Sequence, residues 1–550
     1  MSATRLVLVL ALAGCGLAQP PLIYNRSILN AASFMPNRLP GGAIAQGSIF
    51  SLFGAHLGPT SPVQVSAFPL GTSLANVSIS VTQATVTTSA IPLYVSASQI
   101  NAIMPSNTPT GAVSVRVTYN GQKSNPMTAV VAQSAPGVFS ARGTGFGPGI
   151  FFNFVSQSNQ PINSPTVTAK PGQAITLYGT GLGPVASDTV APTAGNLPTK
   201  VELFVGGVSA GIQYSGRTPC CSGLDQIVFN VPNNAPLGCW VPVTVRTAGT
   251  TAGNVTTLAV TADGSSCFQA NPPLPFITAG NYGALALVRA TTHQDVGTKA
   301  AIDVTADYQT AVVMNVADSP FPFHPVLSLP PAGTCTSYSV KGDLLRGDTL
   351  TGYLTTSTPA PLASAFTLTG PRGMKMLPGV LSASPLNYLG AALSTSLIPN
   401  TLFLDPGSYQ ISGTGNGSVG SFSASLSAAA PLTWTNRDQL LTVNRSQPLP
   451  ISWTGGAANQ TVAILGFSVD LPTDSTSVFG CLAPSGATSF MVPSLAMANL
   501  PATRSNPLNS KSVIYLLSYP DSGLASLGAS GLNSSYAAFT YLNGKTVIFQ

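Results

Sequence analysis

Charge is scarce in this sequence of 550 residues. Lys, Arg, Asp and Glu together make up 7% of it, against about 25% in an ordinary globular domain, and Glu202 is its single glutamate. Exposed helices depend on Glu and Lys side chains for stability and solubility, so long surface helices are nearly excluded. The polar residues are mostly Ser, Thr, Asn and Gln, and Thr and Val suit strands. The composition therefore predicts an all-β protein.

Runs of basic residues are also absent. The net charge of +6 comes from 21 basic and 15 acidic residues that are scattered along the chain. A surface that follows a phosphate backbone needs clustered cations, so nucleic acid is not expected as a partner. After the N-terminus, no stretch reaches the roughly 18 uninterrupted apolar residues of a membrane helix. Any attachment to a membrane would therefore depend on the N-terminal segment.

The N-terminus has the features of an export signal. Arg5 supplies a positive charge, residues 6–13 form a short apolar core, and small residues follow. Cleavage after residue 18 would release a protein that begins at Gln19. The sequence Leu-Ala-Gly-Cys that ends at Cys15 also resembles the lipobox of bacterial lipoproteins, in which the cysteine is lipidated. Both outcomes stay open, and both predict an exported protein that is secreted or attached to the cell surface or outer membrane.

Six cysteines remain once Cys15 is set aside, an even number in a chain directed to an oxidising compartment. Disulfides are therefore expected. Four of the six lie close enough in sequence for two local bridges, the other two could form a long-range pair, and the spacing does not fix the connectivity. The adjacent pair at 220 and 221 lacks the spacing that lets two thiolates face one zinc ion, so no metal site is expected. The candidate disulfide cysteines are Cys220, Cys221, Cys239, Cys267, Cys335 and Cys481.

Three blocks of sequence occur twice, in the same order. Gly-Ser-Ile-Phe-Ser-Leu-Phe-Gly at 47–54 returns as Gly-Gln-Ala-Ile-Thr-Leu-Tyr-Gly at 172–179, and Leu-Gly-Pro follows each copy. A run of alternating apolar residues starts at Val77 and again at Val201, and a Gln-Ile block starts at Gln99 and again at Gln226. Repeated blocks with a period of two predict tandem copies of one two-sheet sandwich. The glycine that ends each first block is expected to permit a turn that a Cβ would obstruct.

The two copies differ most in one loop. The second copy has an insertion between Tyr214 and Gln226, whereas in the first copy the equivalent Gln99 lies only five positions after Tyr94. The ordinary interpretation of the insertion is a disulfide-pinned turn that replaces core contacts. Because loops added to a rigid scaffold often carry function, the alternative is a rigid candidate binding loop. The residues of this loop are Arg217, Thr218, Pro219, Cys220 and Cys221.

The repeated first block, with the Leu-Gly-Pro that follows, resembles the opening of IPT/TIG domains, which are immunoglobulin-like folds. Further motifs resemble a tandem module of secreted acidobacterial proteins; they begin at Asn30 (Asn-Ala-Ala-Ser-Phe), Tyr94 (Tyr-Val-Ser-Ala-Ser-Gln-Ile-Asn), Ala135 (Ala-Pro-Gly-Val-Phe) and Pro219 (Pro-Cys-Cys-Ser-Gly-Leu-Asp-Gln). The resemblance covers about residues 24–262. It implies immunoglobulin-like sandwiches and export, and it implies no particular activity.

The expected fold is all-β, with tandem immunoglobulin-like β-sandwiches followed by further β-rich domains. At roughly 100 to 200 residues per domain, the chain has room for about four. After Cys267 the repeated motifs stop, but short strand-like runs with Gly and Pro turns continue. The expected segments are a signal peptide at 1–18, sandwiches at 24–140 and 141–267, and β-rich domains at 268–430 and 431–550.

Catalytic machinery is hard to find in this sequence, and no cofactor, metal ligand or catalytic residue is assigned. His293 and Asp295 would lie on one face of a strand as a feasible metal-binding or acid–base pair, which Asp303 and Asp307 could join only if the fold brings them near. We therefore expect a non-enzymatic binding or adhesion protein with a protein or polysaccharide ligand. An extracellular hydrolase with its site in 268–550, or a purely structural envelope component, remains as an alternative.

The export signal makes a prediction about the mature protein. We expect the N-terminal segment to be removed, and mass spectrometry of the mature N-terminus should find either a diacylated Cys15 or a free Gln19. The first result means a membrane-tethered protein and the second a released one. A mature protein that retains the whole apolar core would contradict the export prediction.

Overall fold

The structure is a computed structural model of the chain. Strands dominate it, and within the described residues the one α-helix, α1 (Ser494–Met497), is four residues long, which confirms the all-β prediction. None of the described helices is long and apolar enough to cross a membrane. The export signal, with Cys15, lies outside the described residues. The described residues are 19–249, 251–267, 279–296, 299–325, 328–344, 360–378, 387–393, 402–456, 460–503, 510–520 and 524–550.

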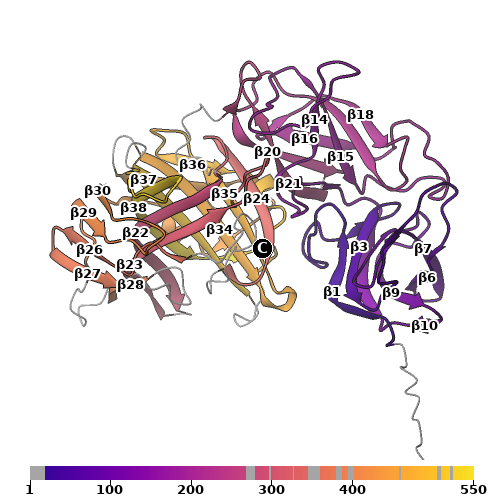
Figure 1. The fold of residues 1–550 in the computed structure, drawn as a ribbon, viewed down its shortest axis with the longest axis horizontal. Helices are drawn as coiled ribbons and strands as arrows, with labels where there is room; N and C mark the ends of the chain where they lie inside the picture. The colour runs from indigo at the N-terminus through magenta and orange to yellow at the C-terminus, as the bar shows by residue number, and fades with distance from the viewer. Residues whose placement is uncertain are drawn as a thin grey trace, which may run out of the picture.

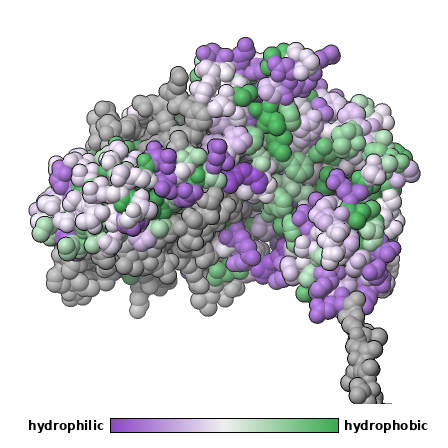
Figure 2. All heavy atoms as spheres, in the orientation of Figure 1, coloured by the Kyte–Doolittle hydropathy of each residue, from purple (hydrophilic) through white to green (hydrophobic). Residues whose placement is uncertain are grey.

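The chain forms two tandem sandwiches and a larger C-terminal β-rich region, residues 280–550 (Figure 1). The second sandwich lies between the first sandwich and the C-terminal region. Much of the visible surface has intermediate hydropathy, as expected from the low charge (Figure 2). Hydrophobic residues gather on the second sandwich near β20 and β21.

The first sandwich is one continuous path of strands that folds into two layers. Its order is β1-β3-β8-β7-β6-β9-β11-β2, and β7 belongs to both layers because it pairs with β6 through its first half and with β8 through its second. Ile79 and Val81 of β6 face the core beside their partners Val117 and Val115 of β9. The strands are β1 (Leu22–Asn30), β2 (Ile44–Ala45), β3 (Ile49–Ala55), β4 (Val63–Gln64), β5 (Ser73–Leu74), β6 (Val77–Gln83), β7 (Val86–Val95), β8 (Gln99–Ile103), β9 (Gly111–Tyr119), β10 (Gln122–Lys123) and β11 (Met127–Ala132).

The second sandwich has two separate sheets. One runs β12-β15-β19-β18 with β14 beside β15, and the other runs β13-β21-β20-β16-β17. Ile175, Leu177 and Phe229 from the first sheet pack against Val243 and Val245 from the second. The strands are β12 (Gly137–Val138), β13 (Gly147–Pro148), β14 (Phe151–Asn153), β15 (Ala174–Thr180), β16 (Val201–Val205), β17 (Val208–Ser209), β18 (Ile212–Arg217), β19 (Asp225–Asn230), β20 (Gly238–Thr247) and β21 (Thr251–Val260).

The repeated sequence blocks are equivalent strands. The first block is β3 and β15, the second β6 and β16, and the third β8 and β19; β3 pairs with β8 as β15 pairs with β19. The expected turn at the glycines is wrong, because Gly54 and Gly179 lie inside β3 and β15. A Cβ at either position would meet the carbonyl oxygen of a neighbouring strand, that of Leu22 or Gly137, so glycine allows close strand approach there.

The C-terminal region is built on one nine-stranded sheet of order β24-β35-β34-β37-β38-β22-β23-β25, with β28 beside β23. Smaller sheets are β27-β26-β29-β30, β31-β33-β36 and β32-β39. The strands and helices are β22 (Gly280–Val296), β23 (Lys299–Val316), β24 (Thr334–Lys341), β25 (Ala360–Pro361), β26 (Ala365–Gly370), β27 (Gly373–Pro378), β28 (Asn387–Leu393), β29 (Gly407–Gly413), β30 (Phe422–Ala428), β31 (Leu432–Trp434), η3 (Arg437–Gln439), β32 (Thr442–Val443), β33 (Leu449–Gly455), β34 (Gln460–Asp470), η4 (Leu471–Thr473), β35 (Ser475–Leu482), β36 (Ser489–Val492), α1, β37 (Ser510–Pro520), β38 (Ser534–Thr546) and β39 (Ile548–Phe549).

Strands from both sides of residue 430 share the large sheet, since β22 pairs in parallel with β38. Two cores lie on it. The four-stranded sheet packs Phe366 and Tyr409 against Leu287 of β22, and the three-stranded sheet packs Trp453 against Ile464 of β34. A division at residue 430 into units that fold separately stays a prediction, but the sheet itself runs across that position.

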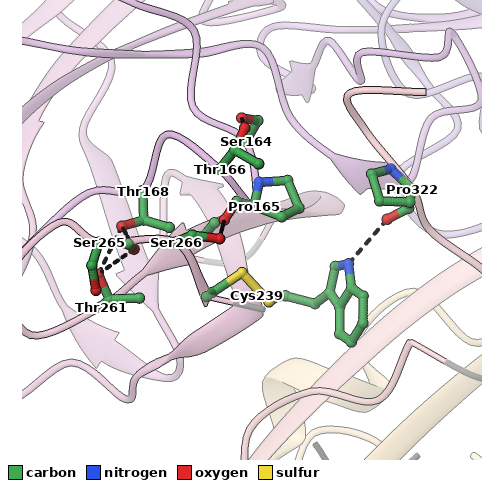
Figure 3. The surroundings of a disulfide bond; sticks show 12 residues. Ser164, Pro165, Thr166, Thr168, Cys239, Thr261, Ser265, Ser266 and Pro322 are labelled. Atoms are coloured by element: carbon green, nitrogen blue, oxygen red, sulfur yellow. Dashed lines mark hydrogen bonds between the residues drawn. A yellow bond between two sulfur atoms is a disulfide. The ribbon is translucent and has the colours of Figure 1, made fainter. Parts of the chain in front are cut away.

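An aromatic cluster joins the second sandwich to the C-terminal region. Phe146 and Trp240 pack with Phe323, Tyr338 and neighbouring apolar side chains. The Trp240 indole N–H donates to the carbonyl of Pro322 at 3.2 Å, directly beside Cys239 (Figure 3). Because this interface is aromatic, buried and hydrogen-bonded, it holds the two parts in a defined orientation.

His324 comes directly after Phe323 of this cluster, and its burial predicts that the stability of the protein depends on pH. Burial lowers the pKa of His324 to about 4, below the usual value of about 6.5, so the unfolded chain binds more protons between these values. The free energy of unfolding should therefore fall as the pH falls from about 6.5 to about 4. We expect His324→Asn to flatten this part of a denaturation-against-pH profile. His56→Asn, at an exposed position, is the control, and equal profiles for wild type and His324→Asn would contradict the prediction.

Candidate functional site

The inserted loop of the second sandwich begins at a buried cation. Arg217, the last residue of β18, is 2% exposed. Its Nη1 contacts the carboxylate of Asp225, the first residue of β19. Its Nη2 donates to the carbonyl of Gly183 at 2.7 Å and to the carbonyl of Gly47, in the first sandwich, also at 2.7 Å. One guanidinium therefore ties the loop, its own sandwich and the neighbouring sandwich together.

The charges of this buried cluster balance each other, because Arg217 is paired with Asp225. Asp225 also accepts a hydrogen bond from the backbone N–H of Leu182 at 2.8 Å. Burial raises the pKa of Asp225, while contact with Arg217 and the backbone N–H groups of Leu182 and Gly181 acts in the opposite direction. An isolated buried ion would be very costly, and the paired cation and carboxylate together carry no net charge.

Further contacts cross the junction between the sandwiches, which we call the seam. The Thr180 hydroxyl donates to the carbonyl of Gly223 at 2.6 Å and accepts from the backbone N–H of Ile49 at 2.8 Å. Gly223 has φ +79°, and a Cβ there would meet Ile49 and Ile103 of the first sandwich. Glycine is therefore needed here both for the backbone conformation and for close packing across the seam.

Residues 185–197 form a second loop over the seam. The backbone N–H and hydroxyl of Ser106, in the first sandwich, donate to the carboxylate of Asp188 at 2.7 and 2.8 Å. The backbone N–H of Leu70 donates to the carbonyl of Thr189 at 2.7 Å, and the Ser222 hydroxyl donates to the carbonyl of Val190 at 3.1 Å. Both sandwiches thus hold this loop in place.

A cleft of about 220 Å³, which we call the seam cleft, lies between the two loops. Residues 185–197 form one side, and Arg217, Ser222 and Gly223 form the other. The Arg217 Nε atom is buried without a hydrogen-bond partner among the described residues, and Asp188, whose carboxylate accepts from Ser106, also lines the cleft. Two residues that line the cleft thus carry an unused donor and an acceptor, the pair of functions that a hydroxyl group needs.

The candidate binding loop has a buried base and an exposed tip. Arg217 and Thr218 are buried in the seam, Pro219 and Cys220 are exposed, and Cys221 is half-buried. A disulfide joins Cys220 to Cys221. The buried base and the disulfide match the pinned turn expected from the sequence, while a binding role for the tip stays a prediction.

The structure supplies the disulfide connectivity that the spacing left open. Cys239 is bonded to Cys267, 28 residues further on, and Cys335 is bonded to Cys481, 146 residues further on. The first bridge ties the start of β20 to the segment after β21 (Figure 3). The second joins facing residues of β24 and β35.

His293, the sequence-based candidate for acid–base chemistry, faces Asp303 across the β22–β23 pair. Its Nδ1 lies 2.7 Å from Asp303 Oδ1, and Arg437 contacts the other oxygen of Asp303 at 3.3 Å. The side chain of Asp295, the partner suggested by the sequence, lies outside the described residues. Asp303 therefore joins His293, as the sequence allowed but could not show.

Asp307 belongs to a different cluster. Its carboxylate is fully buried, pairs with Arg289, and accepts the backbone N–H groups of Phe403 and Leu404. Arg289 also contacts Asp405 at 3.2 Å, so this cluster fastens the 402–405 segment to the large sheet. Among the residues that the structure describes, no group of three or more His, Cys, Asp or Glu is arranged to hold a metal ion.

The sequence-based reasoning missed Asp225, Asp188 and the carbonyl acceptors of Arg217. One feature of the sequence could have pointed to the Arg217–Asp225 pair. In a chain with 7% charged residues, Arg217 and Asp225 flank the inserted loop, and a short antiparallel connection brings such flanking residues face to face. The acceptors on Gly47 and Gly183 left no trace in the sequence, because any residue carries a carbonyl.

No protein-family model matches this chain, and no curated protein matches it. Similar solved structures include SGBP-B of the mixed-linkage glucan utilization locus of Bacteroides ovatus, in complex with a mixed-linkage heptasaccharide: 11% identity, TM-score 0.13, 83% of this chain and 84% of that chain covered. SGBP-B of a complex xyloglucan utilization locus in Bacteroides uniformis has 11% identity and a TM-score of 0.16, with 65% and 80% covered. A tandem pair of immunoglobulin domains from titin has 9% identity and a TM-score of 0.12, with 41% and 95% covered. TM-scores this low carry no argument about function.

Loss of the buried cation should destabilise the protein strongly. Arg217→Met leaves the Asp225 carboxylate buried and unpaired, and we expect it to lower the free energy of unfolding by about 3–5 kcal/mol. Adding Asp225→Asn should restore part of the loss, because the second change removes the unpaired charge. Chemical denaturation measures both effects.

The control is Lys200→Met, which removes a cation from an exposed pair with Glu202 at 3.8 Å. We expect a change of at most about 0.5 kcal/mol from it. If Arg217→Met cost no more than this control, Arg217 would not hold the seam.

Proposed function

We propose that this chain is an exported, non-enzymatic binding protein whose ligand enters the seam cleft. The observation that carries the proposal is the unpartnered Nε–H of Arg217, a buried donor on a residue that lines the cleft. A buried donor without an acceptor costs free energy, and a ligand oxygen would satisfy it. Because both sandwiches hold the walls, the site is organised before the ligand arrives.

The charges favour a neutral, hydroxyl-rich ligand. Arg217 is already balanced by Asp225, and Asp188 adds a carboxylate to the lining, so the cleft has no free cation for an anionic group. Its volume of about 220 Å³ is below the roughly 300–1,000 Å³ of most small-molecule sites. We infer that it takes one sugar unit of a neutral polysaccharide whose other units remain outside.

The rest of the proposal concerns the setting of the cleft. We propose that residues 24–262 form the IPT/TIG-like tandem module that their motifs resemble, and that the protein is secreted or held at the cell surface through Cys15. The exposed tip at Pro219 and Cys220 would contact the polymer beyond the cleft. A structural role in the cell envelope is the competing proposal, supported by the close junctions at the seam and at Trp240.

A matched pair of substitutions tests the seam cleft. Ala191 and Ala194 are both exposed residues of the same loop, but only Ala191 lines the cleft. We expect Ala191→Trp to weaken binding to a neutral polysaccharide by about tenfold or more, because the indole fills the cleft. Ala194→Trp should bind as the wild type does.

The measurement is affinity electrophoresis against a panel of neutral polysaccharides, followed by calorimetry on those that bind. Absence of binding across the panel, or equal weakening by both substitutions, would overturn the proposal. Retention of the unbound wild-type protein in the insoluble envelope fraction would then favour the structural role.

A further inference from the structure

A second cleft lies where the second sandwich meets the C-terminal region. Its volume is about 240 Å³. One wall is the outer face of β16 and β20, with Phe204, Thr244 and Arg246, and the other comes from β24 and the α1 segment, with Ser337 and Leu495. We call it the C-terminal cleft. It is separate from the seam cleft, since the two share no lining residue.

Arg246 is held in a fixed orientation at this cleft. It sits on β20 opposite Glu202 on β16, and its Nε donates to Glu202 at 2.9 Å. The guanidinium carbon lies 5.1 Å from the centroid of the Phe204 ring, a cation–π distance. The single glutamate of the chain thus occupies the Nε side of the guanidinium, and neither Nη group has a hydrogen-bond acceptor in the described part of the chain.

A buried hydroxyl lies on the opposite wall. Ser337 is 2% exposed, and its Oγ has no hydrogen-bond partner among the described residues. A buried hydroxyl without a partner points to a group that the protein does not itself supply. The Cys335–Cys481 disulfide joins the strand that carries it to β35.

We propose that the C-terminal cleft binds the carboxylate-bearing ring of a uronic acid in an acidic polysaccharide. The free Nη edge of a guanidinium matches the two oxygens of a carboxylate. Ser337 and Thr244 supply hydroxyl partners for the ring, and Pro242 and Leu495 supply apolar surface for its face. The net charge of +6 also favours approach of an anionic polymer.

This chemistry differs from that of the seam cleft. Each arginine contacts one carboxylate, but Arg217 is buried and both of its Nη groups already have acceptors, whereas the Arg246 side chain is 31% exposed and pairs with Glu202 through Nε alone. The two sites would therefore take different sugar units, neutral at the seam and acidic here. A polymer that carries both could engage both sites and gain avidity.

Calorimetry and NMR titration of the full-length protein with glucuronate and galacturonate test the proposal. We expect binding that weakens with salt, and no binding of glucose at this cleft. Arg246→Gln should weaken uronate binding by about tenfold or more, because it removes the charged bidentate donor. Lys200→Gln, which removes a neighbouring cation outside the cleft lining, should leave the affinity within about twofold.

Ser337→Ala provides a second variant that changes no charge. It should weaken uronate binding by roughly threefold to tenfold, as expected for one hydrogen bond, and it keeps the test decisive if Arg246→Gln does not fold. Ala191→Trp at the seam should leave uronate binding unchanged, so the two sites can fail independently.

Three outcomes would overturn the proposal. The first is absence of uronate binding to the wild type, and the second is equal affinity of wild type and both cleft variants. The third is binding of acetate or N-acetylglycine as tightly as uronate, which would show that the cleft recognises a carboxylate without its sugar ring.

Discussion

A guanidinium removed from water needs acceptors for its N–H groups, and Arg217 finds those for its two Nη groups on both sandwiches. Asp225 neutralises it, while the carbonyls of Gly47 and Gly183 fix its position. The acceptor on Gly47 exists only when the first sandwich is docked, so the ion pair couples the loop conformation to the seam. The seam cleft depends on the same contact, because Arg217 forms one of its walls.

The second junction uses different chemistry. Between the second sandwich and the C-terminal region the contacts are aromatic, with Trp240 at their centre. The second sandwich is thus fixed by an ionic cluster on one side and by apolar packing on the other. Both clefts lie beside these junctions. The seam cleft is lined by loops of the second sandwich that contacts with the first sandwich hold in place, whereas the walls of the C-terminal cleft come from two modules.

Much of the fold could be predicted from local pattern. The alternation around Val77 and Val201 identified equivalent strands, because a strand with one buried face repeats every two residues. The glycines at 54 and 179 were correctly seen as intolerant of a side chain but were wrongly placed in turns. In a β protein a glycine serves a close strand contact as readily as a turn, and the sequence around it does not distinguish the two.

The sequence by itself determined the all-β class, the tandem repeat, the even set of cysteines and the loop in which the copies differ. These are local properties, set by composition and spacing. The tertiary structure alone decided which cysteines pair, that His293 meets Asp303, and that the base of the loop is buried at the seam. The physical reason is that partners are chosen by packing between distant segments. β22 and β38, for example, lie side by side although they stand at opposite ends of the C-terminal region.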